Sequence, residues 1–200
     1  MKRKNNIIRL LVGITLIIGS LLTIQFKYLS EKKIEKKEEK SINNFIKENN
    51  NNPVAEEIQK ENINYTQYDY IGVIEIPKIN LKRGFVDKNS KYNDVRYNVQ
   101  ILNESQMPNI EKGNFILAAH AGNTRVSFFK NIKNLSINDE VLIYFQNKKY
   151  SYKIVKTYEI EKNGYANIVR DKSKTTLTLI TCKSGTNYQI IVICELKESE

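Results

Sequence analysis

The sequence predicts a mostly β domain, folded as a closed or nearly closed barrel of about seven or eight short strands, behind a membrane-spanning helix and a polar stalk. Three observations support this: an uncharged apolar run near the N-terminus, a charged spacer after it, and short apolar runs separated by turns from residue 70 onwards. We therefore expect a cytoplasmic N-terminus and transmembrane anchor at 1–26, a partly helical stalk at 27–67 and the barrel domain at 68–200.

The first 26 residues have the features of a membrane anchor. Residues 10–26 carry no charge, and Ile7 and Ile8 extend this apolar run beyond Arg9, which approaches the ~20 residues that cross a bilayer. Basic residues at 2–4 precede the run, so the positive-inside bias keeps the N-terminus in the cytoplasm and places the domain outside the cell. A cleavable signal peptide has the same order of segments and stays the alternative, although no A-x-A-like site follows.

Residues 27–67 form a spacer between the anchor and the domain. The part from Ser30 to Glu48 is charged and predicts a solvated helix, NNNNP at 49–53 ends it, and a further short helix is expected over AEEIQKENI at 55–63. Few apolar side chains are available for burial here, so we expect a stalk that holds the domain away from the membrane.

Short runs rich in β-branched and aromatic residues follow from Tyr70 and predict strands. Pro77 indicates an edge or bulge near the end of the first strand. Hairpin turns are expected at QNKK (146–149) and KSGTN (183–187), and a short helix at VSFFKNIKNL (126–135). The predicted strands are YIGVIEIPKI (70–79), NFILAAHAG (114–122), EVLIYF (140–145), YSYKIVKTYEIE (150–161), TTLTLITC (175–182) and YQIIVICEL (188–196).

The formal net charge of +10 raises the question of nucleic-acid binding. Part of this charge lies at residues 2–4, where it serves membrane topology, and elsewhere lysine and glutamate are mixed, as in EKKIEKKEEK at 31–40. No element that combines aromatic and basic residues, such as an RRM signature, is present. We expect no nucleic-acid partner, and an exported basic domain close to the anionic polymers of the cell surface.

Two residues that can do chemistry each end a predicted apolar strand. His120, the single histidine, follows FILAA, and Cys182, one of two cysteines, follows TLTLIT. Each has a structural alternative, because a free cysteine is often a small buried hydrophobe and a lone histidine beside apolar residues is usually structural. If the two strand ends share one rim of the barrel, the thiol and the imidazole supply what nucleophilic acyl transfer needs.

A disulfide between Cys182 and Cys194 is the competing interpretation, since export permits it. If KSGTN closes a hairpin, Cys194 lies six residues beyond the position opposite Cys182, or roughly 20 Å away at ~3.3 Å per residue. A disulfide needs Cα atoms within about 7 Å, so we expect two free thiols. One histidine and two separated cysteines also lack the spacing of a metal site, and no cofactor is expected.

The anchor, IGVIEIPKINL at 71–81, GNFILAAHAGN at 113–123 with FFKNI behind it, and TLTLITC at 176–182 resemble the sortases, the membrane-anchored cysteine transpeptidases of Gram-positive bacteria. The resemblance covers about residues 70–196. It implies an eight-stranded closed β-barrel in which Cys182 cleaves an LPxTG-like sorting signal of a surface protein through a thioester. The acyl group then passes to an amine on a peptidoglycan precursor or a pilin.

The sequence departs from the family at one position. Sortases usually carry an arginine on the strand after the cysteine, whereas Gln189 stands in that place here and no arginine follows Arg170. The resemblance implies that the residue at this position donates a hydrogen bond to the oxyanion. The side-chain NH2 of Gln189 can donate such a bond, although it lacks the charge of an arginine. We assign Gln189 to this role, with Arg125 or Arg170 reaching in from a loop as the alternative. A one-residue slip of the last hairpin would instead bring Tyr188 to the site.

The subclass and the activity follow from smaller features. The chain has no tryptophan, so it lacks the Asp-Pro-Trp type of lid found in many pilin sortases. The segment from Glu161 to Lys174 is short, which argues against the longer helical insertion of class B enzymes. Together these features favour a class A- or D-like sortase. Because the arginine is missing, a catalytically weak or silent cell-surface binding module is the alternative function. A cysteine hydrolase that releases peptides to water is the third.

Overall fold

The computed structural model describes residues 2–50 and 68–200 of the chain. It divides into two compact units, Met1–Lys40 and Ser41–Glu200. The part of the expected stalk at 51–67, with its second short helix, lies outside the described residues. The predicted helix over 30–48 is confirmed as part of one continuous helix, α1 (Lys2–Asn50). It is not solvated throughout, because Ile42 and Ile46 are buried in a cluster with Val73 and Tyr144.

Helix α1 includes a segment whose length and composition suit a membrane. The span Gly13–Lys47 contains an apolar window with mean hydropathy 1.3, none of it buried. A helix of 20 residues is about 30 Å long, which is the thickness of the hydrocarbon core. An N-terminal signal sequence shares these features, so membrane anchoring stays a prediction.

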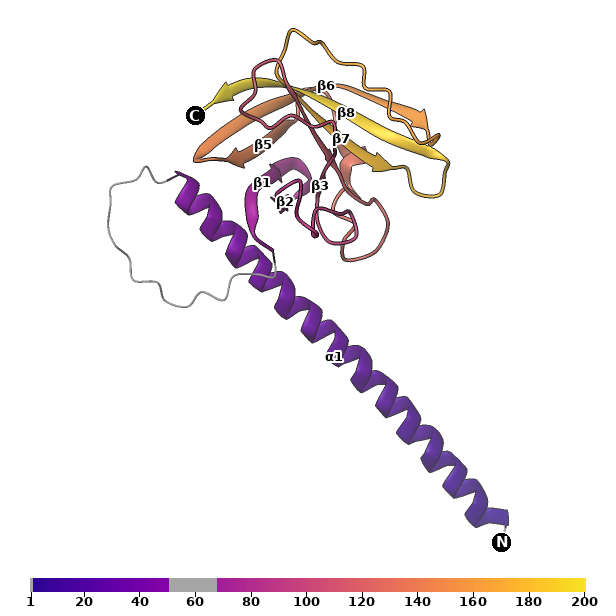
Figure 1. The fold of residues 1–200 in the computed structure, drawn as a ribbon. Helices are drawn as coiled ribbons and strands as arrows, with labels where there is room; N and C mark the ends of the chain where they lie inside the picture. Colours follow the sequence, from indigo (N-terminus) through magenta and orange to yellow (C-terminus); the bar gives the residue numbers. More distant parts are fainter. Residues whose placement is uncertain (1, 51–67) are drawn as a thin grey trace, which may run out of the picture. The chain divides into compact units, whose positions relative to one another are not determined.

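Eight strands form one mixed sheet in the second unit (Figure 1). Its strand order is β2-β1-β5-β6-β8-β7-β4-β3, which wraps into the nearly closed barrel that the sequence predicted. The β4–β7 ladder is parallel, and the other six described ladders are antiparallel. The strands are β1 (Tyr70–Ile76), β2 (Leu81–Val86), β3 (Gln100–Ile101), β4 (Asn114–Ala118), β5 (Glu140–Phe145), β6 (Lys148–Glu161), β7 (Thr176–Cys182) and β8 (Tyr188–Ser199).

Six strands lie where the sequence placed them, and two were missed. Both β2 and β3 lack a long apolar run, since β2 reads LKRGFV and β3 has only two residues. Pro77 ends β1 as expected, because it begins the short 3-10 helix η1 (Pro77–Ile79). The turn between β5 and β6 is tighter than QNKK, with only Gln146 and Asn147 outside the strands at φ 51° and 58°, the conformation that a two-residue hairpin turn requires.

The prediction of a ten-residue helix over 126–135 is wrong. The segment consists of turns followed by the 3-10 helix η2 (Ile132–Asn134). Phe129, Ile132 and Leu135 are buried and recur every three residues, which matches the 3.0 residues per turn of a 3-10 helix.

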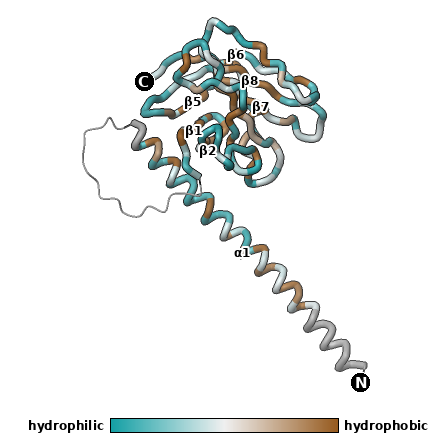
Figure 2. The backbone as a smooth tube through the Cα atoms, in the orientation of Figure 1, coloured by the Kyte–Doolittle hydropathy of each residue, from teal (hydrophilic) through white to brown (hydrophobic). Residues whose placement is uncertain are grey.

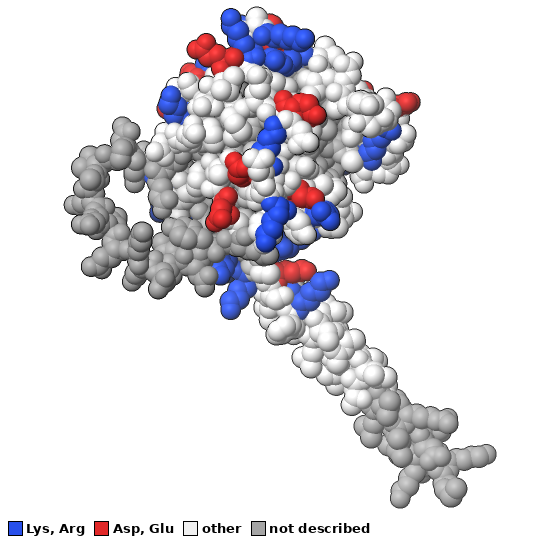
Figure 3. All heavy atoms as spheres, viewed as in Figure 1, with Lys and Arg blue, Asp and Glu red and all other residues white. Residues whose placement is uncertain are grey.

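Apolar side chains pack on both faces of the sheet around β7 and β8. The interior cluster takes Leu177 and Leu179 from β7 and Val192 and Cys194 from β8. A second cluster, on the outer face, contains Ile116, Ile180, Ile191 and Ile193. Figure 2 shows hydrophobic residues along these strands, whereas the connecting loops are largely hydrophilic. On the face of the barrel shown in Figure 3, basic and acidic side chains are interspersed.

Candidate active site

The parallel pairing of β4 with β7 brings His120 and Cys182 to corresponding positions. The ladder between these strands ends with the pair Ala118 and Ile180. His120 and Cys182 each lie two residues further along their own chain. Side chains alternate between faces along β7, so Cys182 lies on the outer face together with Ile180, and His120 follows the end of the neighbouring strand β4. The two strand ends therefore lie at the same rim of the barrel, as the sequence predicted.

Backbone hydrogen bonds continue beyond the ladder and hold the segment around His120. The Ala119 amide donates to the Ile180 carbonyl oxygen at 3.3 Å, and the buried Thr181 hydroxyl donates to the Ala119 carbonyl oxygen at 2.7 Å. On the other side, the Phe129 amide donates to the His120 carbonyl oxygen at 2.9 Å. The backbone of His120 is thus fixed between β7 and the loop that leads to η2.

Gln189 lies directly opposite Cys182 on the neighbouring strand. The β7–β8 ladder pairs these two residues, and β6 pairs Ile160 with Gln189 on its other side. Directly opposed residues present their side chains on the same face, so Cys182 and Gln189 share the outer face, and His120 lies just beyond the end of the next strand, β4. All three are half-buried. Tyr188 is directed to the opposite face, so the one-residue slip does not occur.

An apolar surface adjoins these three residues. The outer cluster around Ile180 and Ile191 includes the partly buried Ala166 and Ile168, from the segment that joins β6 to β7. Tyr158 of β6 fixes this segment, because its hydroxyl donates to the Asn167 carbonyl oxygen and accepts from the Val169 amide, each at 2.8 Å. An extended peptide that approached Cys182 along this face would meet apolar side chains.

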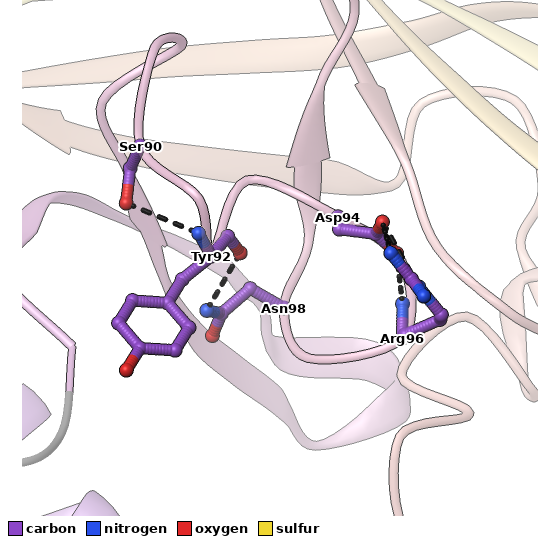
Figure 4. Close-up of polar contacts among 5 residues, drawn as sticks. All are labelled: Ser90, Tyr92, Asp94, Arg96 and Asn98. Carbon is purple, nitrogen blue, oxygen red and sulfur yellow. Dashed lines mark hydrogen bonds and ion pairs between the residues drawn. The ribbon is translucent and has the colours of Figure 1, made fainter.

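Asp94, in the loop before β3, is a charged residue that the sequence reasoning missed. Asp94 accepts hydrogen bonds from the Arg96 side chain, at 2.7 Å from Nη2 to Oδ2, and from the Arg96 amide at 2.8 Å (Figure 4). These bonds hold the pKa of the Asp94 carboxyl below its usual value. The only signal in the sequence is the turn-forming pair Asn93-Asp94 within a polar stretch.

The loop around Asp94 is ordered by side chain to backbone hydrogen bonds. Ser90 Oγ accepts from the Tyr92 amide, and the Asn98 side-chain amide donates to the Tyr92 carbonyl oxygen (Figure 4). The Asn93 side chain bonds both the amide and the carbonyl group of Ile101 in β3. These bonds tie the loop that carries Asp94 to the sheet.

The two cysteines are free, as predicted, and differ in their surroundings. Cys194 is fully buried in the interior cluster, and this burial raises the pKa of its thiol. Cys182 is half-buried at the end of β7. Because the thiolate is the nucleophilic form, the environment of Cys194 suits packing and not reaction. Within the described residues, no group of three or more His, Cys, Asp or Glu side chains is placed to hold a metal ion.

The two loop arginines have different positions. Arg170 hydrogen-bonds the carbonyl oxygens of Lys112, Asp171 and Lys174. Lys112 and Lys174 precede β4 and β7, whereas His120 and Cys182 lie at the far ends of these strands, about 25 Å away at ~3.3 Å per strand residue. The alternative that Arg170 reaches the site is therefore wrong. Arg125 lies exposed in the loop after His120.

Comparisons with known proteins all point to one protein family. A family profile described as the Sortase domain matches residues 74–197. Sortase A of Bacillus anthracis is 29% identical over 114 residues, which cover 57% of this chain and 52% of that protein. Sortase D of Bacillus subtilis strain 168 is 29% identical over 111 residues, or 56% of this chain and 53% of that protein. The chain thus spans about half the length of the curated relatives it matches.

Solved structures of sortases have the same fold. A Clostridium perfringens Sortase D5 transpeptidase matches with a TM-score of 0.59 and 25% identity, over 82% of this chain and 99% of that chain. Sortase C1 of Streptococcus agalactiae matches with a TM-score of 0.58 and 22% identity, over 64% of this chain and 68% of that chain. The nearly closed eight-stranded barrel is the fold of these proteins.

Proposed function

Because this chain belongs to the sortase family, as the Sortase domain match over residues 74–197 shows, we propose that it is a membrane-anchored cysteine transpeptidase. The observation that carries the proposal is the position of His120, Cys182 and Gln189 at the same end of the adjacent strands β4, β7 and β8. Its N-terminal helix supports a single-pass anchor, with the N-terminus in the cytoplasm and the barrel outside the cell.

In the proposed reaction, the Cys182 thiolate attacks the carbonyl carbon of a peptide bond in an LPxTG-like sorting signal. Gln189 donates a hydrogen bond to the resulting oxyanion, and His120 protonates the departing amine. The acyl group is then held as a thioester on Cys182. An amine of a peptidoglycan precursor or a pilin attacks this thioester and His120 accepts the amine's proton. The C–S bond breaks as the new amide bond forms, and the proton passes from His120 to the sulfur.

The proposed substrate path is the apolar face that continues from Cys182. Partly buried Ala166 and Ile168 lie beside Ile180 and Ile191 there, so the apolar residues of a sorting signal would be buried against them. The proposed chemistry uses only side chains of this chain, without a cofactor. Both curated relatives are consistent with a class A- or D-like enzyme.

Mass spectrometry of the full-length protein with a sorting-signal peptide and an amine acceptor tests this function. We expect the acyl-enzyme mass on wild-type protein and on the Cys194→Ala variant, and none on Cys182→Ala. His120→Ala should lose about 10²–10⁴-fold in transfer, the usual contribution of a general acid–base. Equal loss from the two cysteine variants would contradict Cys182 as nucleophile.

The same assay separates the alternatives. A silent binding module, which the missing arginine favours, would bind the peptide without any acyl-enzyme. A cysteine hydrolase would form the acyl-enzyme and yield only free peptide acid, whatever amine is added. Joined product in the presence of the amine supports the transpeptidase.

A further inference from the structure

A pocket of about 310 Å³ opens beside Cys182, on the side away from the apolar surface. Its lining includes Thr181 and Ile190, which alternate in register with Cys182 and Gln189 and therefore belong to the opposite face of the sheet. Ala121, the residue after His120, also lines it. The pocket thus adjoins Cys182 itself and the residue that follows His120.

The pocket is lined by cations and by no anion. Lys130 and Lys133, from the segment around η2, contribute to it together with Lys183, and its lining contains no aspartate or glutamate. The Lys183 Nζ lies 2.8 Å from Glu159 Oε2, so its charge is compensated. Among the described residues, no carboxylate lies within ion-pair distance of Lys130 or Lys133, and both side chains are exposed. Two lysines without a carboxylate partner among the described residues therefore line the same pocket as Cys182, where the proposed thioester forms.

The position of this pocket relative to Cys182 suits the amine that leaves and the amine that enters. If the acyl donor lies along the apolar outer face, the departing amine leaves on the other side of the carbonyl carbon. The incoming amine reverses that step and enters the same place. An anionic group attached close to this amine would fall within reach of the two lysines, and a charge-assisted hydrogen bond would hold it.

We propose that this pocket selects an acceptor whose amine carries a carboxylate close to it, as an α-amino acid head group does. The inference rests on the proposed transpeptidase function and specifies its acceptor. The amine nitrogen attacks the thioester carbon, the C–S bond to Cys182 breaks, and the amine proton replaces the acyl group on the sulfur through His120. The carboxylate takes no part in the bond changes and is bound by Lys130 and Lys133. A pocket of this size lies at the small end of ligand sites, which suits a compact amino carboxylate.

The test compares glycine with glycinamide as acceptors for the acyl-enzyme of the full-length protein. The ratio of kcat/KM for glycine to kcat/KM for glycinamide is measured for wild type and for the double variant Lys130→Gln/Lys133→Gln. Comparing the two ratios removes the intrinsic difference in reactivity between the amines. We expect the ratio to fall about 3- to 10-fold in the double variant, because each exposed ammonium contributes only a modest attraction. In wild type the ratio should also fall as salt is raised.

Lys174→Gln is the matched control, because Lys174 is exposed just before β7, at the end opposite Cys182. It removes one positive charge away from the pocket and should leave the ratio unchanged. An unchanged ratio in the double variant, with transfer to glycinamide intact, would overturn the acceptor proposal alone. Failure of wild type to form any acyl-enzyme would overturn the proposed function and the acceptor proposal with it.

Discussion

Replacing Gln189 by alanine removes the side-chain amide that lies opposite Cys182 across the β7–β8 ladder. Directly opposed residues have Cβ atoms about 4.5–5.5 Å apart, so an amide two bonds beyond Cβ can reach an oxygen on the carbon that Cys182 attacks. Loss of one oxyanion donor in other enzymes costs about 10²–10³-fold in kcat. Because Gln189 is half-buried and neutral, we expect the lower end, about 10²-fold.

The complementary change is Gln189→Arg, which restores the residue type usual in sortases. Hydrogen bonds from a charged donor are roughly twice as strong as neutral ones, so turnover should be preserved or raised by up to about 10-fold. Tyr188→Phe is the control, because Tyr188 precedes Gln189 on the same strand and its hydroxyl contacts Glu161 at 3.4 Å. It should leave turnover near the wild-type value.

Single-turnover kinetics separates the proposed role from a loss of fold or of peptide binding. Rapid-quench measurement of acyl-enzyme formation at saturating sorting-signal peptide should show a slower chemical step in Gln189→Ala, with the thermal melting temperature unchanged. If Gln189→Ala is silent and Arg125→Ala is slow, the donor comes from the loop after His120. That result would refute the assignment of Gln189.

Two further predictions concern the barrel that holds the site. Gly72→Ala should lower the free energy of unfolding by about 1–3 kcal/mol, because a Cβ there would meet the Phe85 ring and lie 2.7 Å from the Tyr144 carbonyl oxygen. Urea unfolding measures this, and an effect no larger than that of Gly122→Ala, where a Cβ lies 3.4 Å from its nearest neighbour, would contradict it. Burial raises the pKa of Tyr152, whose hydroxyl has no partner among the described residues. Above pH ~10 the unfolded state ionises this group and the native state does not, so stability falls as pH rises. Tyr152→Phe should reduce that fall and stabilise the protein by about 1 kcal/mol at neutral pH; an unchanged pH profile would disprove this reasoning.

Local patterns in the sequence were sufficient for the elements whose signals are strong. The charged segment at 30–48 is helical, and six strands form where apolar β-branched runs are bounded by turns. The missed strands β2 and β3 are short or charged, and they are strands because their neighbours β1 and β4 offer unpaired edges. Around η2, buried residues at a spacing of three gave a 3-10 helix where a longer helix was expected.

The sequence by itself determined which residues can act. Cys182 and His120 stand out because each ends an apolar strand before a polar turn, and this depends only on neighbours along the chain. Local pattern also placed Gln189 within one residue of the position opposite Cys182, because a short hairpin turn constrains the pairing of its two strands.

The tertiary structure decided how these residues meet. β4 and β7 are separated by some 60 residues, and their parallel register sets His120 level with Cys182. Leu179 and Ile180 are both apolar, yet one packs inside the barrel and the other outside. Hydrophobicity is therefore the same on both faces of β7 and β8, and no local pattern can fix the register. Packing of the whole sheet against its interior core fixes it, and with it the face that carries the candidate site.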